Sequence, residues 1–145
     1  MDIFSGINEA QVYGSGQYIQ PGLHGLSVKS VGIIDSQRHP GRKFFCVEFQ
    51  VVESDTHPVG STVTWLVDME KPSRETAFSN IKEFASALLE VTPSEVTEEV
   101  MKAMIGAAQP SASMEVKAEA WHKPTTSGGV FTRIKWYAPQ AVANN

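Results

Sequence analysis

The strongest constraint on the fold is the strict alternation of side chains in residues 43–53. Every second position of this segment belongs to one apolar set, formed by Phe45, Val47, Phe49 and Val51. Successive side chains of a β-strand point to opposite faces of its sheet, so a period of two predicts a strand with one face in a core. Phe44 falls on the other face, where it would join a binding surface or a subunit contact.

Four further segments are predicted to be strands, although their alternation is less complete: residues 23–34, 62–69, 114–121 and 130–137. The first of them contains Gly25 and Gly32, and we expect a bend or a bulge at one of the two. In the second, Trp65 shares a side with Val63 and Val67, which indicates a core position. Three strands are therefore predicted in the first half of the chain and two near its end.

The period of the apolar residues changes between residues 73 and 106. Here apolar side chains recur at helical spacing: Phe78, Ile81, Phe84 or Ala85, and Leu88. Residues 92–95 indicate the start of a second helix, because a threonine cap is followed by a proline and then by a glutamate three residues after the cap. We therefore predict a helical insert of two helices that ends at Gly106.

The element order is β-β-β-α-β-β in a chain of 145 residues, a length that suits one domain with one core. A mainly β, five-stranded antiparallel barrel with a helix between its third and fourth strands is the layout of an OB-fold. Closure into a barrel would also remove the edge strands. Within this single domain we expect residues 1–21 to form an irregular arm and residues 138–145 a short polar tail.

Composition and motifs argue against an enzyme, a membrane protein and a secreted protein. No apolar run approaches the roughly 20 residues of a membrane span, and the N-terminus lacks a signal-peptide pattern. Cys46 is the single cysteine, so no intrachain disulfide forms and a reducing cytosol is expected. The four histidines are scattered, and neither metal-ligand spacing nor a hydrolase or nucleotide-binding motif occurs. We therefore expect no catalysis, no metal and no cofactor.

The charge of the chain is unevenly distributed. A net charge of −4 argues against a protein that coats duplex DNA by bulk positive charge. Residues 113–137, however, hold four bases and two acids, whereas the remaining residues hold eight bases and fourteen acids. The positive charge is therefore concentrated in the predicted final hairpin.

Aromatic and basic residues interleave on one side of this hairpin. If its small and aliphatic residues point inward, the alternation places the following residues on the outward face: Lys117, Trp121, Lys123, Phe131, Arg133, Lys135 and Tyr137. Aromatic rings stack on unpaired bases, and basic side chains pair with phosphates, so this composition suits sequence-independent binding of single strands. The alternative is that the same aromatics are buried in a homo-oligomer or another subunit contact.

Two predicted loops favour the nucleic-acid interpretation, since OB-folds bind through the loop between strands one and two and the loop between strands four and five. The first loop adds three bases to the candidate site: Arg38, Arg42 and Lys43. The second loop, residues 123–129, is rich in glycine, serine and threonine and could close over a ligand. Alternatively, the loop bases are only solvated charges.

Several segments together carry a resemblance to a known family. They are a Gly-rich start with Gln17 and Tyr18, the strand FFCVEFQV at residues 44–51, Gly60 and Ser61 opening the next strand, and a helical insert before a final hairpin. Over roughly residues 14–137 the chain resembles the OB-fold single-stranded DNA-binding proteins of tailed bacteriophages.

The resemblance implies a function in a bacterial host cytoplasm. The chain would protect single-stranded DNA during phage replication or recombination, with replication or recombination proteins as partners. Many such proteins recruit partners through an acidic C-terminal tail, whereas residues 138–145 contain no acid. The acidic insert at residues 73–106 could serve a partner instead. A phage structural or assembly protein is the alternative function.

Overall fold

The computed structural model describes residues 17–36, 39–124 and 130–139, with the backbone alone at Pro124, Val130 and Phe131. Arg38 and most of the predicted loop at residues 123–129 lie outside these ranges, as does the greater part of the predicted N-terminal arm and C-terminal tail. Within the described ranges no helix is long and apolar enough to cross a membrane.

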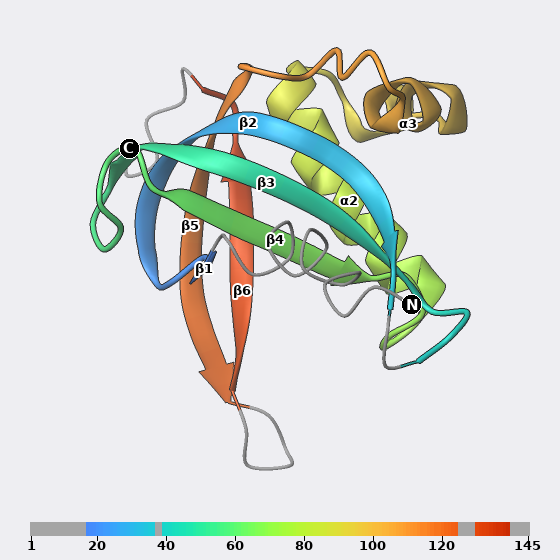
Figure 1. The fold of residues 1–145 in the computed structure, drawn as a ribbon, viewed down its shortest axis with the longest axis horizontal. Coiled ribbons are helices and arrows are strands. Elements are labelled where there is room, and N and C mark those ends of the chain that lie inside the picture. The colour runs from blue at the N-terminus through green and yellow to red at the C-terminus, as the bar shows by residue number, and fades with distance from the viewer. Residues whose placement is uncertain (1–16, 37–38, 125–129, 140–145) are drawn as a thin grey trace, which may run out of the picture.

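The described chain is mainly β and forms one six-stranded sheet (Figure 1). Its strands are β1 (Gln17–Tyr18), β2 (Gly22–Asp35), β3 (Lys43–Ser54), β4 (Thr62–Asp68), β5 (Glu115–Pro124) and β6 (Val130–Tyr137). The spatial order is β1-β4-β3-β2-β5-β6. All neighbours pair antiparallel except β1 and β4, which pair parallel.

The five strands predicted from the alternation are confirmed, but the prediction of five strands in total is wrong. The additional strand, β1, lies inside residues 1–21, for which the sequence predicts an irregular arm. Two residues are too few to show a period of two, so its pairing with Val63 and Thr64 of β4 leaves no pattern in the sequence. The following residue, Ile19, is only 2% exposed and anchors this segment in the core.

The sheet is strongly curled, and β5 and β6 run at a steep angle behind β3 and β4 (Figure 1). The pairing of β2 with β3 shifts register between Gly25 and Leu26 and again between Val28 and Ser30. Such bulges bend a strand and increase its twist. The bend expected at Gly25 or Gly32 is therefore confirmed at Gly25, and no register shift occurs at Gly32.

The sequence predicts a closed barrel, but the described part of the chain forms an open, curled sheet. Its edges are β1 and β6, and no backbone pairing joins them. The gap is bridged by side chains instead, since the rings of Trp65 on β4 and Trp136 on β6 lie 4.8 Å apart. The core position predicted for Trp65 is confirmed, because its ring also packs against Phe84, 5.2 Å away.

Helix α2 (Arg74–Leu89) packs against the inner side of the curled sheet and contacts β4, β5 and β6 (Figure 1). It begins at Ser73, whose Oγ accepts a hydrogen bond from the Thr76 N–H at 3.1 Å. Its core-facing residues are Ala77, Ile81, Phe84, Ala85 and Leu88. Phe78, which the sequence placed in this set, is 49% exposed, because its neighbour Ala77 takes the inward position.

The second helix starts later than predicted. The reciprocal bond expected at residues 92–95 is present, with the Thr92 N–H donating to Glu95 Oε1 at 3.1 Å. It opens only a single 3-10 turn, η1 (Pro93–Glu95). Val96 then adopts an extended backbone and is 3% exposed, so its burial interrupts the helix. Helix α3 (Glu98–Ile105) begins after Thr97 and contacts β2.

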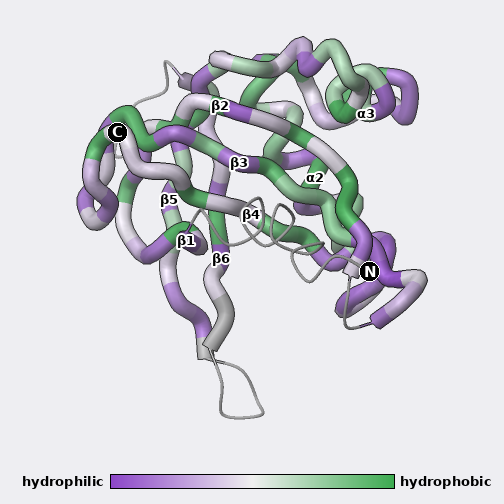
Figure 2. The backbone as a smooth tube through the Cα atoms, in the orientation of Figure 1, coloured by the Kyte–Doolittle hydropathy of each residue, from purple (hydrophilic) through white to green (hydrophobic). Residues whose placement is uncertain are grey.

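The core lies between the concave side of the sheet and α2. Its largest fully buried side chains are Phe45, Phe49 and Phe84. The Phe49 ring stacks on Trp136 at 5.7 Å, and Phe84 meets Trp136 edge to face at 4.9 Å. Figure 2 shows hydrophobic and hydrophilic stretches following one another along β2 and β3.

Candidate nucleic-acid interface

The β5–β6 hairpin holds most of the residues that the sequence selected. Val116, Ala118 and Ala120 on β5 are all at most 4% exposed, as is required if the other residues of the strand face outward. The strands pair antiparallel with Lys117 opposite Tyr137 and Lys123 opposite Phe131. Cross-strand partners share one face of a sheet, so these residues lie on the same surface.

We call this surface the hairpin face. Its described side chains are Lys117, Glu119, Trp121, Lys123, Arg133, Lys135 and Tyr137. The Phe131 backbone lies in register with them, and its side chain lies outside the description. Trp121 is opposite Arg133 and is 40% exposed, an unusual position for the largest apolar side chain.

Glu119 occupies the middle of the hairpin face, opposite Lys135. Its Oε1 accepts a hydrogen bond from the Tyr137 hydroxyl at 3.1 Å. The Lys135 Nζ lies 5.3 Å from the centre of the Tyr137 ring, within cation–π range. Sequence reasoning omitted Glu119 from the site, although the alternation of β5 alone places it beside Lys117 and Trp121.

These contacts divide the hairpin face into two parts. Tyr137 is half-buried and held at one end by Glu119 and Lys135, so one side of its ring is already occupied. Trp121, toward the tip of the hairpin, is the more exposed aromatic side chain. The part of the hairpin face around Trp121 and Arg133 is therefore the better stacking platform.

Two of the bases predicted in the first loop, Arg42 and Lys43, lie elsewhere and have acidic partners. Arg42 forms an ion pair with Asp68 at the end of β4, and Lys43 Nζ lies 2.6 Å from Asp35 Oδ1. These residues adjoin one end of β2, whereas Gly22, at the other end of this 14-residue strand, pairs with Ala120 of the hairpin. Figure 1 shows the β2–β3 connection well apart from the hairpin.

The structure therefore does not bring Arg42 and Lys43 next to the hairpin face. Partial burial of Asp68 acts to raise its pKa. Hydrogen bonds from the Glu70 and Lys71 N–H groups and the Arg42 guanidinium act in the opposite direction, and together they lower the pKa of Asp68. A stable carboxylate beside Arg42 reduces the charge that this arginine offers to a phosphate.

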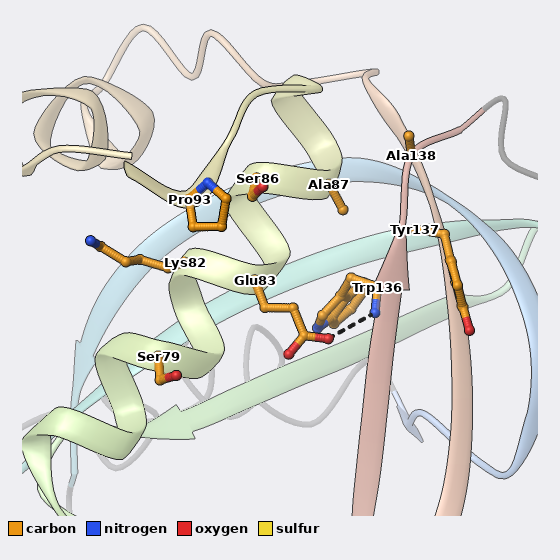
Figure 3. Close-up of a pocket in the computed structure, with 9 residues that line it drawn as sticks. All are labelled: Ser79, Lys82, Glu83, Ser86, Ala87, Pro93, Trp136, Tyr137 and Ala138. Carbon is orange, nitrogen blue, oxygen red and sulfur yellow. Dashed lines mark hydrogen bonds between the residues drawn. The ribbon is translucent and has the colours of Figure 1, made fainter. Parts of the chain in front are cut away.

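A pocket of about 490 Å³ adjoins the hairpin face between α2 and the end of β6 (Figure 3). Its lining consists of Ser79, Lys82, Glu83, Ser86, Ala87, Pro93, Trp136, Tyr137 and Ala138. Glu83 points toward Trp136, whose backbone N–H donates to Glu83 Oε1 at 3.4 Å. Tyr137 belongs to both the pocket and the hairpin face. The sequence gives no signal for this pocket, because it depends on how α2 packs against β6.

The described residues contain no group of three or more histidine, cysteine, aspartate or glutamate side chains placed to hold a metal ion. The thiol of Cys46 is 6% exposed, and burial together with the neighbouring Glu48 raises its pKa to about 11. A thiol with this pKa is protonated at neutral pH and is a poor nucleophile.

No protein-family model matches this chain, and no curated protein matches it significantly.

Proposed function

We propose that the chain binds single-stranded DNA independently of sequence and that the hairpin face is its binding surface. The observation that carries the proposal is the register of β5 and β6, which sets the exposed Trp121 opposite Arg133 and puts Lys123 and Lys135 on the same surface. An indole offers a stacking surface to an unpaired base, and the neighbouring cations can contact the phosphates on either side.

The strand order supports an OB-like architecture for this proposal. Strands β4, β3 and β2 form an antiparallel meander, and β5 returns after the helices to pair with β2 before β6 completes the hairpin. A five-stranded, partly open Greek-key barrel has this connectivity, and such barrels bind oligonucleotides. In this proposal β1 is an addition to the outer edge of β4.

The charge distribution supports a single strand rather than a duplex as the ligand. The hairpin face carries four bases and one acid, with Glu115 at the start of β5 as a further acid on the same side, whereas the whole chain has a net charge of −4. Local cations suffice for a short single strand, but the overall charge opposes a long duplex. The sequence resemblance supports the biological setting, which is protection of single-stranded intermediates during phage DNA replication or recombination in a bacterial cytoplasm.

A homo-oligomer or assembly contact is the second candidate, and one observation favours it. Leu23 on β2 is 36% exposed and pairs with Glu119, so it lies diagonally across the sheet from Trp121. An exposed aliphatic residue near an exposed indole, surrounded by charges, also resembles the centre of a protein interface.

The two candidates separate in one experiment. Fluorescence anisotropy is measured with a labelled oligo-thymidine strand and with a duplex of the same length, and sedimentation velocity is run on the same samples. The proposal predicts tight binding of the strand and weak binding of the duplex. If the strand does not bind at low salt and the chain sediments as an oligomer that Trp121→Asp dissociates, the hairpin face is a subunit interface.

A further inference from the structure

Two buried histidines lie side by side at the end of the molecule where β2 begins. His24 on β2 is 3% exposed, and His57, in the turn after β3, is 6% exposed. Their ring centres are 5.4 Å apart. Buried ionisable side chains are costly unless their hydrogen bonds fix one protonation state, so the partners of these rings decide what the pair can do.

The hydrogen bond of His57 requires a neutral ring. The backbone N–H of Gln20 points at His57 Nε2 at 3.0 Å. An amide nitrogen in the backbone donates and does not accept, so Nε2 carries no proton. Burial of the ring, followed by the neighbouring His24, lowers the pKa of His57 below its ordinary value of 6.5.

The hydrogen bonds of His24 are complete when its ring is neutral as well. Its Nε2 lies 2.7 Å from the Gln20 carbonyl oxygen, to which it donates. Its Nδ1 lies 2.7 Å from Ser54 Oγ. That oxygen already accepts from the N–H groups of Thr56 at 3.0 Å and His57 at 2.8 Å. The hydroxyl hydrogen of Ser54 is therefore left to donate to Nδ1.

Both backbone groups of one residue, Gln20, are thus held by the two rings. Gln20 directly follows Ile19, which is buried in the core, and β1, which pairs with β4. Together, His24 and His57 fasten the β1 segment to the turn after β3.

We propose that His24 and His57 form an acid-sensitive latch that holds the β1 segment in place at neutral pH and releases it when His57 takes up a proton. A proton on His57 Nε2 faces the backbone N–H of Gln20, so the hydrogen bond between them loses its acceptor. The latch does not depend on the proposed DNA binding.

Among the described residues, the charged side chains nearest the pair face away from it or are already hydrogen-bonded. On β5 the residue paired with His24 is Ala118, with Ala120 next on the same face, while Lys117 and Glu119 point to the opposite face. The nearest acids in the chain are Glu53 and Asp55. Asp55 Oδ2 accepts from the Leu23 N–H at 2.9 Å, and the Glu53 side chain lies over Gly25. The described residues between Gln17 and Ser27 carry no Asp, Glu, Lys or Arg.

The direction of the pH effect follows from linkage. The folded-state pKa of His57 is below 6.5, so the latch is fully stable above that pH and weakens as the pH falls below it. Each proton taken up on opening raises the opening constant by up to about tenfold per pH unit.

Amide hydrogen exchange measured by NMR tests the latch. Protection factors, corrected for the intrinsic exchange rate, are compared at about pH 7.5 and about pH 5, the range in which histidine titrates. The Gln20 amide should lose protection at the lower pH, by up to about thirtyfold for one proton taken up on opening, while the Val47 amide of the central strand β3 keeps its own. His57→Gln should remove this pH dependence, because a side-chain amide oxygen can accept from Gln20 without titrating. His122→Gln, which alters an exposed histidine of β5, should retain it.

Three results would overturn the proposal. They are constant Gln20 protection across the range, an equal loss at Gln20 and Val47, and an undiminished loss in the His57→Gln variant. If that variant does not fold, two measurements on the wild-type chain decide. The NMR titration of the His57 ring and the loss of Gln20 protection must then occur over the same pH range.

Discussion

Trp121 is the side chain on which the proposed binding depends most. Base–aromatic stacking contributes about 1–3 kcal/mol per base, so Trp121→Ala should weaken oligo-thymidine binding by about 5- to 150-fold. The fold should persist because the ring is 40% exposed. The matched control is Phe78→Ala, which removes another exposed aromatic ring, from α2 and away from the hairpin face. Equal affinities of the two variants in an anisotropy titration would argue against the site.

Glu119 is the one acid among the described side chains of the hairpin face. Glu119→Gln removes its charge but keeps an oxygen that can accept from the Tyr137 hydroxyl. Removing one partly exposed charge changes binding by about 0.5–1 kcal/mol, so the variant should bind an anionic strand about two- to fivefold more tightly. Weaker binding in the same anisotropy assay would mean that Glu119 contacts the ligand or orients Tyr137 in a way glutamine cannot reproduce.

Gln109 acts on stability and not on binding. Its side-chain amide pairs with the backbone of Val31, accepting from the N–H at 2.8 Å and donating to the carbonyl at 2.8 Å. Gln109→Ala leaves both groups of a buried residue unpaired, which should lower the free energy of unfolding by about 1–3 kcal/mol. Urea denaturation measures the loss, and Gln50→Ala, at an exposed position of β3, should change it by less than about 0.5 kcal/mol.

At the scale of elements, the two threonines before α3 have different tasks. Thr97 Oγ1 accepts from the Val100 N–H at 3.2 Å and caps a helix, whereas Thr92 starts only the turn η1. Thr97→Ala should therefore reduce the free energy of unfolding by about 1 kcal/mol. The measurement is a urea denaturation curve. A larger loss in Thr92→Ala than in Thr97→Ala would show that the 3-10 turn is the more important start.

The same region shows why local sequence signals misplace an element. Threonine, proline and glutamate at residues 92–95 satisfy the local rules for a helix start, and the reciprocal bond does form. Whether a helix continues depends on Val96, which the core buries in an extended conformation. The sequence predicts the hairpin face more completely. The pairing of β5 with β6 has no register shift, so the alternation along each strand determines which residues share a face.

At the scale of the whole molecule, the modest positive charge of the hairpin face limits the salt dependence. Four bases and one acid correspond to about three or four phosphate contacts. Each contact on a single strand contributes about −0.7 to the slope of log affinity against log salt, so a slope of about −2 to −3 is expected. Anisotropy titrations at several salt concentrations measure it. A slope near zero would contradict phosphate binding, and a much steeper one would require bases from outside the hairpin face.

The sequence predicts the parts of the fold that repeat locally and misses those that depend on distant contacts. The five long strands and the two helices follow from their periods. Three features join residues far apart in the chain, and no local sequence pattern predicts them. They are the strand β1, the ion pair of Arg42 with Asp68 and the pocket between α2 and β6. The OB-fold layout places Arg42 and Lys43 in the site by analogy of position, whereas the structure separates them from the hairpin by the length of β2.

Tryptophan fluorescence during an oligo-thymidine titration tests the central claim most directly. Of the three tryptophans, Trp65 and Trp136 pack in the core, and Trp121 lies on the hairpin face. Binding through this face predicts quenching that saturates with the affinity measured by anisotropy. In Trp121→Phe the quenching should disappear while binding persists, because phenylalanine also stacks. Binding of the strand with unchanged Trp121 emission, or quenching that persists in Trp121→Phe, would contradict the assignment of the hairpin face as the binding surface.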